Sequence, residues 1–412
     1  MTEKGNRMDF KFSGYHVFVV GLLAFLQFTV VLDFMILSPL GVLVMEKLQI
    51  STQQFGFVVS AYAFSAGISG IFAAGFADRF DRKKLLLFFY VGFVLATFLC
   101  GIATNYFFLF GARILTGIFA GVLSSISFAI VADLFPLQVR GRVMGFIMTA
   151  FAASQVFGLP IGIYISNLWG WQSPFLMIAG ISGMVGFVIF IFLKPLTTHL
   201  DHKTDTHAFH HLVKTLTQAK YLPAFLATTL LATGGFMLMP FGSAFSVHNL
   251  GVKLEDLPLV YMITGVVSML GGPLMGRLSD AIGKYNMFVI ASILAAFIII
   301  YYTKMEITPL PIVIFVNSIL FVFVAARMIS ANALTSAVPD LHDRGAFMAI
   351  SSSIQQISGG IAASVAGLIV IQTSSGYMER YDILGYVVAS AIVLTVILMY
   401  NVNQIVLKKH TK

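Results

Sequence analysis

The stretch GFADRFDRKK (residues 75–84) places six charged side chains in ten positions of a chain that is 58% hydrophobic. A related stretch, GRLSDAIGKY, occupies residues 276–285. Aligning AGFADRFDRK (74–83) with it gives an offset of 202 residues, about half of the 412-residue chain. Internal repetition at a fixed offset indicates an architecture of repeated units.

A second pair of segments repeats at nearly the same offset. FPLQVRGRVMG (135–145) aligns with VPDLHDRGAFM (338–348) at an offset of 203 to 204 residues. Because two independent landmarks agree, the chain is predicted to be a tandem repeat. We expect an N-terminal six-helix bundle over 1–195, a cytoplasmic linker over 196–221 and a C-terminal six-helix bundle over 222–412.

The composition predicts that both bundles lie in a membrane. Only 10% of the residues are charged, whereas soluble chains carry about 25%, and the mean hydropathy is +0.92. The apolar residues form long blocks, and roughly 20 such residues let a helix cross a bilayer. The fold class is therefore an all-α integral membrane protein of twelve spans. The predicted spans are 15–41, 54–76, 85–104, 107–132, 143–166, 173–195, 222–246, 256–276, 286–303, 311–336, 346–371 and 382–404.

The basic residues set the expected orientation. Of 25 Lys and Arg residues, two (Arg113 and Arg327) lie deep within predicted spans and four (Lys47, Lys253, Lys304 and Arg380) lie in the loops on one side. The other nineteen lie in segments on the opposite side, which the positive-inside rule makes cytoplasmic. Both termini are therefore expected in the cytoplasm, and the net charge of +8 gives no reason to expect nucleic-acid binding.

The repeated charged stretch and several other segments resemble those of the major facilitator superfamily. Its signature after the second span, G-x-L-a-D-R-x-G-R-K, has a counterpart here with Ala in place of the first Gly and Asp in place of the second. The matching residues are Ala74, Gly75, Phe76, Ala77, Asp78, Arg79, Phe80, Asp81, Arg82 and Lys83. The segments LDFMILSPLG (32–41) and NLWGWQSPF (167–175) are similar to those of twelve-span drug:proton antiporters near the bacterial sugar-efflux (arabinose-efflux-like) permeases.

The resemblance suggests a role for the charged stretch. A carboxylate at Asp78 can interact with the positive N-terminal end of a neighbouring helix, and the resemblance suggests the eleventh span, which begins near Gly345. Such a contact would form and break as the two halves move. The basic neighbours are expected to face the inner leaflet and to pair with Asp81 or Asp78. The alternative is that the charges serve only topology. The predicted latch residues are Asp78, Arg79, Arg82, Lys83 and Asp280.

Asp33 is the one acidic residue predicted deep in a span, and such residues are costly and mark function. Counting from the same side, Asp33 lies roughly 12 Å and Arg113 roughly 10 Å down their helices. We therefore expect the two to pair. Burial favours the neutral carboxyl group and a neighbouring guanidinium favours the charged one, so Asp33 is the predicted proton site and Arg113 its modulator. A static pair that only fixes packing is the alternative.

Arg327 is a second buried base, near the middle of the tenth span. With several Gln residues at similar depth it forms a predicted polar belt for substrate binding, and Phe241 is a further candidate. With Asp33 ionised, the buried charges sum to +1, which favours neutral polyols, zwitterions or anions. Arg327 bonded to carbonyls or to an Asn is the alternative. The substrate-binding candidates are Gln27, Gln155, Arg327, Gln355, Gln356 and Phe241.

Glycines mark two further spans. Arg113-x-x-x-Gly117-x-x-x-Gly121 is similar to a second signature of the superfamily, and glycines four apart allow close helix contact. GLPIG (158–162) is similar to the glycine-proline signature of exporters. We expect Gly158, Pro160 and Gly162 to form a hinge in the fifth span.

The linker carries five histidines but no cysteine, and its apolar residues recur at helical spacing. We therefore favour an interfacial amphipathic helix over a metal-sensing segment, and no metal site is predicted. The histidines are His199, His202, His207, His210 and His211.

The predicted function is secondary active transport: proton-coupled antiport that exports a small organic solute, which is sugar-like, anionic, zwitterionic or drug-like, by alternating access. No enzyme activity or cofactor is expected, and the proton gradient supplies the energy. The expected partners are the solute, protons and membrane lipid, and the protein is expected to be a monomer in a bacterial inner membrane. An importer, symporter or facilitator on the same fold, a lipid-handling flippase and a transporter-like sensor remain alternatives.

Overall fold

In the computed structural model, residues 12–76, 80–197, 208–340 and 342–410 are described, and they are almost entirely helical. Eleven spans in this part are long and apolar enough to cross a membrane. They comprise α1 (Gly14–Ile36), α3 (Thr52–Phe76), α4 (Arg82–Gly101), α5 (Tyr106–Leu134), α6 (Leu137–Ala153) with η2 (Ser154–Gly158) and α7 (Leu159–Trp169), α8 (Ser173–Phe192), α10 (Leu222–Leu238) with η4 (Met239–Phe241) and α11 (Gly242–His248), α12 (Leu257–Ile282), α13 (Lys284–Tyr302), α14 (Leu310–Thr335) and α16 (Tyr381–His410).

A twelfth long helix, α15 (Arg344–Ile369), is less apolar than the others. Its sequence SSSIQQISGG (351–360) supplies Ser, Gln and Gly, and this helix packs against α3 and α10. Because protein covers these faces, α15 needs less apolar surface for lipid. The twelve predicted spans are therefore present.

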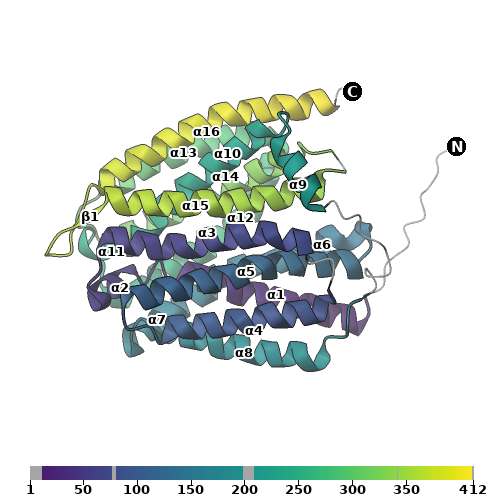
Figure 1. Cartoon of the computed structure of the whole chain (residues 1–412). Coiled ribbons are helices and arrows are strands. Elements are labelled where there is room, and N and C mark those ends of the chain that lie inside the picture. Colours follow the sequence, from purple (N-terminus) through teal and green to yellow (C-terminus); the bar gives the residue numbers. More distant parts are fainter. Residues whose placement is uncertain (1–11, 77–79, 198–207, 341, 411–412) are drawn as a thin grey trace.

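The helices form one bundle, in which α16 ends at the side opposite α2 (Gly41–Leu48), α11 and a short hairpin (Figure 1). The antiparallel hairpin pairs β1 (Ile371–Gln372) with β2 (Met378–Glu379) between α15 and α16. We call the side where α1 begins and α16 ends the terminal end, and the opposite side the distal end.

The first predicted span, 15–41, is wrong at its end, because α1 stops at Ile36 and α2 follows as a separate helix. Pro39 explains the break, since proline lacks a backbone N–H and disfavours helical backbone in the residue before it. In the second half, α11 begins at Gly242, 201 residues after Gly41, so the short helix repeats too.

The fifth span is irregular, as the glycine-proline segment predicts. Between α6 and α7 it forms the π-helical turn η2, which ends at Gly158 just before Pro160. A π turn accommodates an extra residue in a helix and commonly marks a functional site. The predicted hinge region therefore contains a π turn, and its role as a hinge stays a prediction.

Three large hydrophobic clusters separate the two ends of the bundle. The shared core, at the distal end, joins residues of both halves, including Leu32, Phe55, Phe241 and Tyr381. At the terminal end each half has a core of its own, one around Phe93 and Phe135 and one around Phe225 and Phe347. The two halves are therefore fused at the distal end and have separate cores at the terminal end.

The linker contains one described helix, α9 (Ala208–Thr217). It buries Leu212 and packs against α15 and α3, so it touches both halves at the terminal end. This is the helix that the apolar spacing predicts.

Candidate functional site

Asp33 and Arg113 form the ion pair that their depths predict. Arg113 Nη1 lies 2.8 Å from Asp33 Oδ2, and the side chains are 1% and 0% exposed. The same Nη1 donates to the backbone carbonyl of Asp33 at 3.2 Å. The two charges lie between α1 and α5 in the first half, away from solvent.

The pair is incompletely satisfied. Asp33 Oδ1 and Arg113 Nε are both buried and have no hydrogen-bond partner among the described residues. Buried polar atoms without partners are uncommon in folded proteins and call for an explanation, such as a redox or catalytic role or an unseen ion or water. Asp33 Oδ1 can therefore accept a proton or a further hydrogen bond, and Arg113 Nε–H can donate a further hydrogen bond.

Tyr62 is the neighbour that sequence reasoning missed. The guanidinium carbon of Arg113 lies 4.5 Å from the centre of the Tyr62 ring, and Phe175 lies on another side at 5.9 Å. Such cation–π contacts stabilise a buried cation without neutralising it. The only sequence signal was an aromatic residue facing α5 from the second span.

Gly117 brings Tyr62 to this position. A Cβ atom on Gly117 would lie 2.4 Å from the backbone carbonyl oxygen of Tyr62 and 2.0 Å from Ser65 Oγ. A Cβ on Gly121 would lie 2.2 Å from the carbonyl oxygen of Ala66. At these two glycines the backbones of α3 and α5 come into close contact.

The hinge glycines pack against α1 beside Asp33. Gly158 faces Leu32 and Gly162 faces Ile36, each so closely that a Cβ atom would lie within 2.6 Å of the side chain. Ser154 Oγ also donates to the carbonyl of Phe28 at 3.1 Å. Thus η2 and α7 are seated on the turn of α1 that carries the carboxylate, whereas Pro160 is buried in the first turn of α7.

The predicted polar belt is distributed over several interfaces. Gln27 is 4% exposed, and its Nε2 has no hydrogen-bond partner in the described part. Oε1 of Gln356 also has no described hydrogen-bond partner. Gln356 lies against Gly67 of α3, and the backbone of Gln155 lies against Gly265 of α12, so both lie between the halves. Gln355 is partly buried.

Arg327 and Phe241 are buried inside the protein, apart from the glutamines of the predicted belt. Arg327 Nε donates to Ser292 Oγ at 2.9 Å, and its guanidinium lies 5.6 Å from the Phe288 ring, so these contacts are within the second half. No described acidic side chain pairs with Arg327, and its Nη2 has no partner in the described part. Phe241 is fully buried in the shared core, edge-on to Phe55.

The charged stretch is only partly described, because Asp78 and Arg79 lie outside the described residues. Arg82 pairs with Asp133 at 3.0 Å, and Lys83 Nζ donates to the Phe190 carbonyl. The expected pairing with Asp78 stays a prediction, since that residue lies outside the described part. The described partners of the Arg82 and Lys83 side chains are not Asp81. The reason is local: Asp81 caps α4, and its Oδ1 accepts the backbone N–H of Lys83.

The second copy of the stretch also pairs locally. Asp280 is 69% exposed at its side chain and forms an ion pair with Lys284, four residues further on. The described ion pairs of Arg82 and of Asp280 each lie within one half. The latch itself stays a prediction, since its central carboxylate lies outside the described part.

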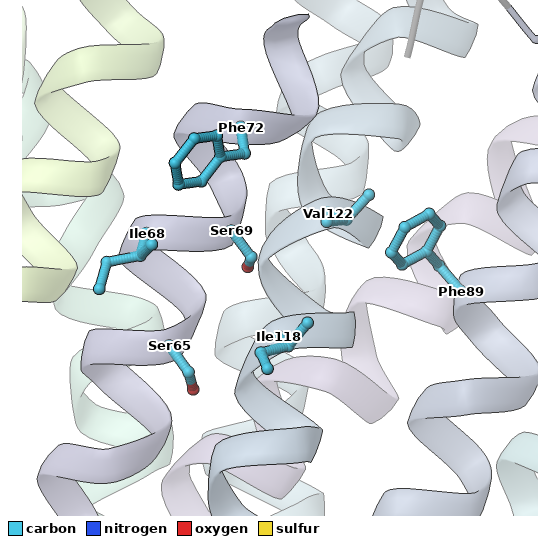
Figure 2. Close-up of a pocket in the computed structure, with 7 residues that line it drawn as sticks. All are labelled: Ser65, Ile68, Ser69, Phe72, Phe89, Ile118 and Val122. Carbon is cyan, nitrogen blue, oxygen red and sulfur yellow. The ribbon is translucent and has the colours of Figure 1, made fainter. Parts of the chain in front are cut away.

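A groove of about 440 Å³ lies on the outside of the first half, between α3 and α5 (Figure 2). Its residues are Ser65, Ile68, Ser69, Phe72, Phe89, Ile118 and Val122. Ser65 and Ser69 donate to carbonyls of their own helix, so the groove is apolar. No residue of the ion pair or of the belt lines it, which separates it from the candidate site.

Twelve long helices in two related halves, with an ion pair buried among them, are typical of secondary transporters. The model of the Major Facilitator Superfamily matches residues 23–363, with a second match over 224–404. The chain therefore belongs to the Major Facilitator Superfamily.

Named relatives are distant. Multidrug resistance protein 2 of Bacillus subtilis (strain 168) is 25% identical over 268 residues, which are 64% of this chain and 67% of that protein. A probable sugar efflux transporter of Helicobacter pylori (strain G27) is 22% identical over 269 residues, 65% of this chain and 66% of that protein.

A solved structure shares the fold. The crystal structure of a bacterial homologue of the human lysosomal transporter Spinster, in an inward-facing and unoccupied conformation, matches with a TM-score of 0.79. The match covers 97% of this chain and 99% of that chain at 15% identity. It supports the twelve-helix fold and nothing finer.

Proposed function

We propose that this transporter is a proton-coupled antiporter that exports a small organic solute. The observation that carries the proposal is the Asp33–Arg113 pair: a carboxylate and a guanidinium 2.8 Å apart, buried, each with an unpartnered atom. Burial favours the protonated carboxyl group, and Arg113 favours the ionised one. A change in the distance between these two side chains therefore changes the proton affinity of Asp33, which is what coupling requires.

The geometry supports a route for that change. Asp33 lies on α1 directly beside η2 and α7, whose backbone packs against α12 of the second half. A movement of the second half would displace the π turn first. The π turn would then displace the turn of α1 that carries Asp33. Coupling of this kind needs an element with two arrangements, and a π turn is a suitable one.

The orientation is part of the proposal. The excess of Lys and Arg supports cytoplasmic termini in a bacterial inner membrane, which makes the terminal end the cytoplasmic one. The shared core then seals the outer side and the separate cores lie on the inner side. This arrangement fits the inward-facing state of an alternating-access cycle.

The buried charges favour a polar solute. Arg327 has no described acidic partner, so Asp33, Arg113 and Arg327 together leave one uncompensated positive charge. A neutral polyol, zwitterion or anion suits such surroundings better than a lipophilic cation does. The multidrug and sugar-efflux names of the relatives favour export of an organic solute.

The test uses purified protein in liposomes that enclose a pH-sensitive dye, with pooled solutes added under an imposed pH gradient. We expect solute-dependent proton flux for the native chain and none for Asp33→Asn, which keeps the side-chain volume. The matched control is Glu255→Gln, which neutralises an exposed acid in a distal loop and leaves the flux unchanged.

Other outcomes select the alternatives. Proton flux that persists in Asp33→Asn moves the coupling site elsewhere. Solute flux without proton flux makes the protein a facilitator, and proton and solute moving in the same direction makes it a symporter. Transfer of labelled lipid between leaflets would support a flippase.

A further inference from the structure

A cluster of metal-ligand residues lies at the terminal end, far from the ion pair. His211 of α9, His342 of the α14–α15 connection and Asp343, which directly precedes α15, place their ligand atoms within 4.8 Å of one another. The rings of the two histidines lie 4.8 Å apart at their centres, at an angle of 58°. His211 lies about 130 positions before the adjacent His342 and Asp343, so a local sequence motif does not predict the cluster.

We propose that His211, His342 and Asp343 bind a divalent transition-metal ion of the zinc type. Imidazole and carboxylate are ordinary ligands for Zn²⁺, at bond lengths near 2.0–2.2 Å. Two ligands of a tetrahedral ion with such bonds are about 3.3 Å apart. His211 Nε2 and Asp343 Oδ1 are already 3.0 Å apart, so an ion replaces the proton between them with little movement.

The third ligand is free to complete the site. His342 is exposed, so its ring can turn about its side-chain bonds to close the remaining distance. Three protein ligands leave a fourth tetrahedral position for water or another group. This arrangement goes beyond what the linker histidines suggest, because two of the three ligands belong to the second half.

The neighbours of Asp343 orient it as the partners of a metal ligand do. Tyr221 donates its hydroxyl to Asp343 Oδ2 at 2.7 Å, which leaves Oδ1 directed at His211. This hydrogen bond is the main reason that the pKa of Asp343 is lowered. A hydrogen bond to the far oxygen of a ligating carboxylate fixes the orientation of that ligand.

Two lysines lie near the cluster and share the carboxylate of Asp340, which offsets one of their two positive charges. Lys220 Nζ lies 2.7 Å from Asp340 and 3.7 Å from Asp343, and Lys409 Nζ lies 3.2 Å from Asp340. A bound ion would fasten α9 to the start of α15. Since α9 also packs against α3, the ion would sit where the linker meets both halves.

The experiment measures binding of Co²⁺ and Zn²⁺ to the full-length protein, purified through a tag without histidine and stripped with a chelator. Tetrahedral Co²⁺ gives a visible absorption signal, and Zn²⁺ displaces it. We expect one site per chain and at least a tenfold loss of affinity in His342→Ala, because a residue that touches the ion contributes at least as much as the groups that orient the ligands, which contribute about 10–100-fold. His342 is exposed, so this variant should fold normally.

Two controls separate this site from others. His248→Ala removes a histidine at the distal end and should bind as the native chain does. Asp33→Asn should also bind normally, so failure of the transport proposal leaves this one untouched. Zn²⁺ should slow tryptic cleavage next to Lys214 and Lys220 in the native chain and not in His342→Ala. Equal affinity in His342→Ala, or loss only in a His207→Ala/His210→Ala variant, would overturn the proposal.

Discussion

Arg113 donates through one nitrogen, Nη1, to both the carboxylate and the backbone carbonyl of Asp33, at 2.8 and 3.2 Å. The second bond does not depend on the charge of the side chain. Protonation of Asp33 therefore weakens the electrostatic attraction and leaves the guanidinium held beside the helix. After protonation the bond to the backbone carbonyl keeps the guanidinium near α1, while the two side chains become easier to separate.

Neutralising the two partners should have unequal effects on stability. Asp33→Asn leaves a buried arginine, which cannot shed its proton, and should cost about 3–5 kcal/mol of unfolding free energy. Arg113→Met leaves a carboxyl group that can take up a proton, so it should cost less, and less still at low pH. The double variant should lose much less than the sum. Cys100 is the one cysteine and is buried, so a thiol-reactive dye reports unfolding directly. Equal and additive losses would contradict an electrostatic pair.

The glycine contact between α3 and α5 predicts a steric effect. Gly117→Ala forces a methyl group into the backbone of Tyr62 and should destabilise the protein by about 1–3 kcal/mol. Gly111→Ala on the same helix meets no atom within 4 Å and should be neutral or stabilise by about 0.5–1 kcal/mol. Thermal unfolding of both variants checks this, and similar melting temperatures would refute the close contact.

The seam between α3 and α15 predicts a conformational effect. A Cβ on Gly367 would lie 2.7 Å from the Thr52 carbonyl, so Gly367→Ala should push the halves apart at the distal end. Gly345→Ala, on the same helix, meets nothing within 4 Å and is the control. Spin labels at Glu46 and Glu255, in a Cys100→Ser background, should report longer distances only in Gly367→Ala. An unchanged distance distribution would contradict the prediction, because it would mean that α3 and α15 accommodate the methyl group without moving apart.

Arg327 offers a test of the substrate prediction. Ser292→Ala removes the described hydrogen-bond partner of Arg327 and should cost about 1–3 kcal/mol. Arg327→Met removes a buried charge that has no described acidic partner, so stability should change little or rise. Substrate affinity should fall in Arg327→Met, measured as the solute concentration for half-maximal flux. Unaltered affinity would make Arg327 a structural residue of the second half.

Helix counting and depth account for what the sequence could predict. Twelve spans follow from the length of the apolar blocks, and the Asp33–Arg113 pair follows from 1.5 Å per residue along two facing helices. The π turn was expected only as a hinge around Pro160, because the choice between a kink and a π turn depends on the packing of Leu32 and Ile36.

Contacts between distant segments could not be predicted in the same way. Arg82 pairs with Asp133, 51 residues away, because α4 and α5 pack side by side, and the sequence carries no register for that packing. Arg327 was assigned to the substrate belt from its depth alone, yet its side chain turns toward Ser292. The position of a residue along its helix, which can be counted from the sequence, gives its depth in the membrane. The direction of its side chain around the helix axis decides its partner, and counting does not give that direction.

The unequal distribution of the cores gives the conformational equilibrium a temperature dependence. Opening the distal end would expose the apolar surface of the shared core, whereas the two clusters at the terminal end each lie within one half. Hydrophobic association weakens on cooling and carries a large heat-capacity change. The equilibrium between the two conformations is therefore expected to depend on temperature. Cooling should favour the state that is open at the distal end, and warming should favour the arrangement described here.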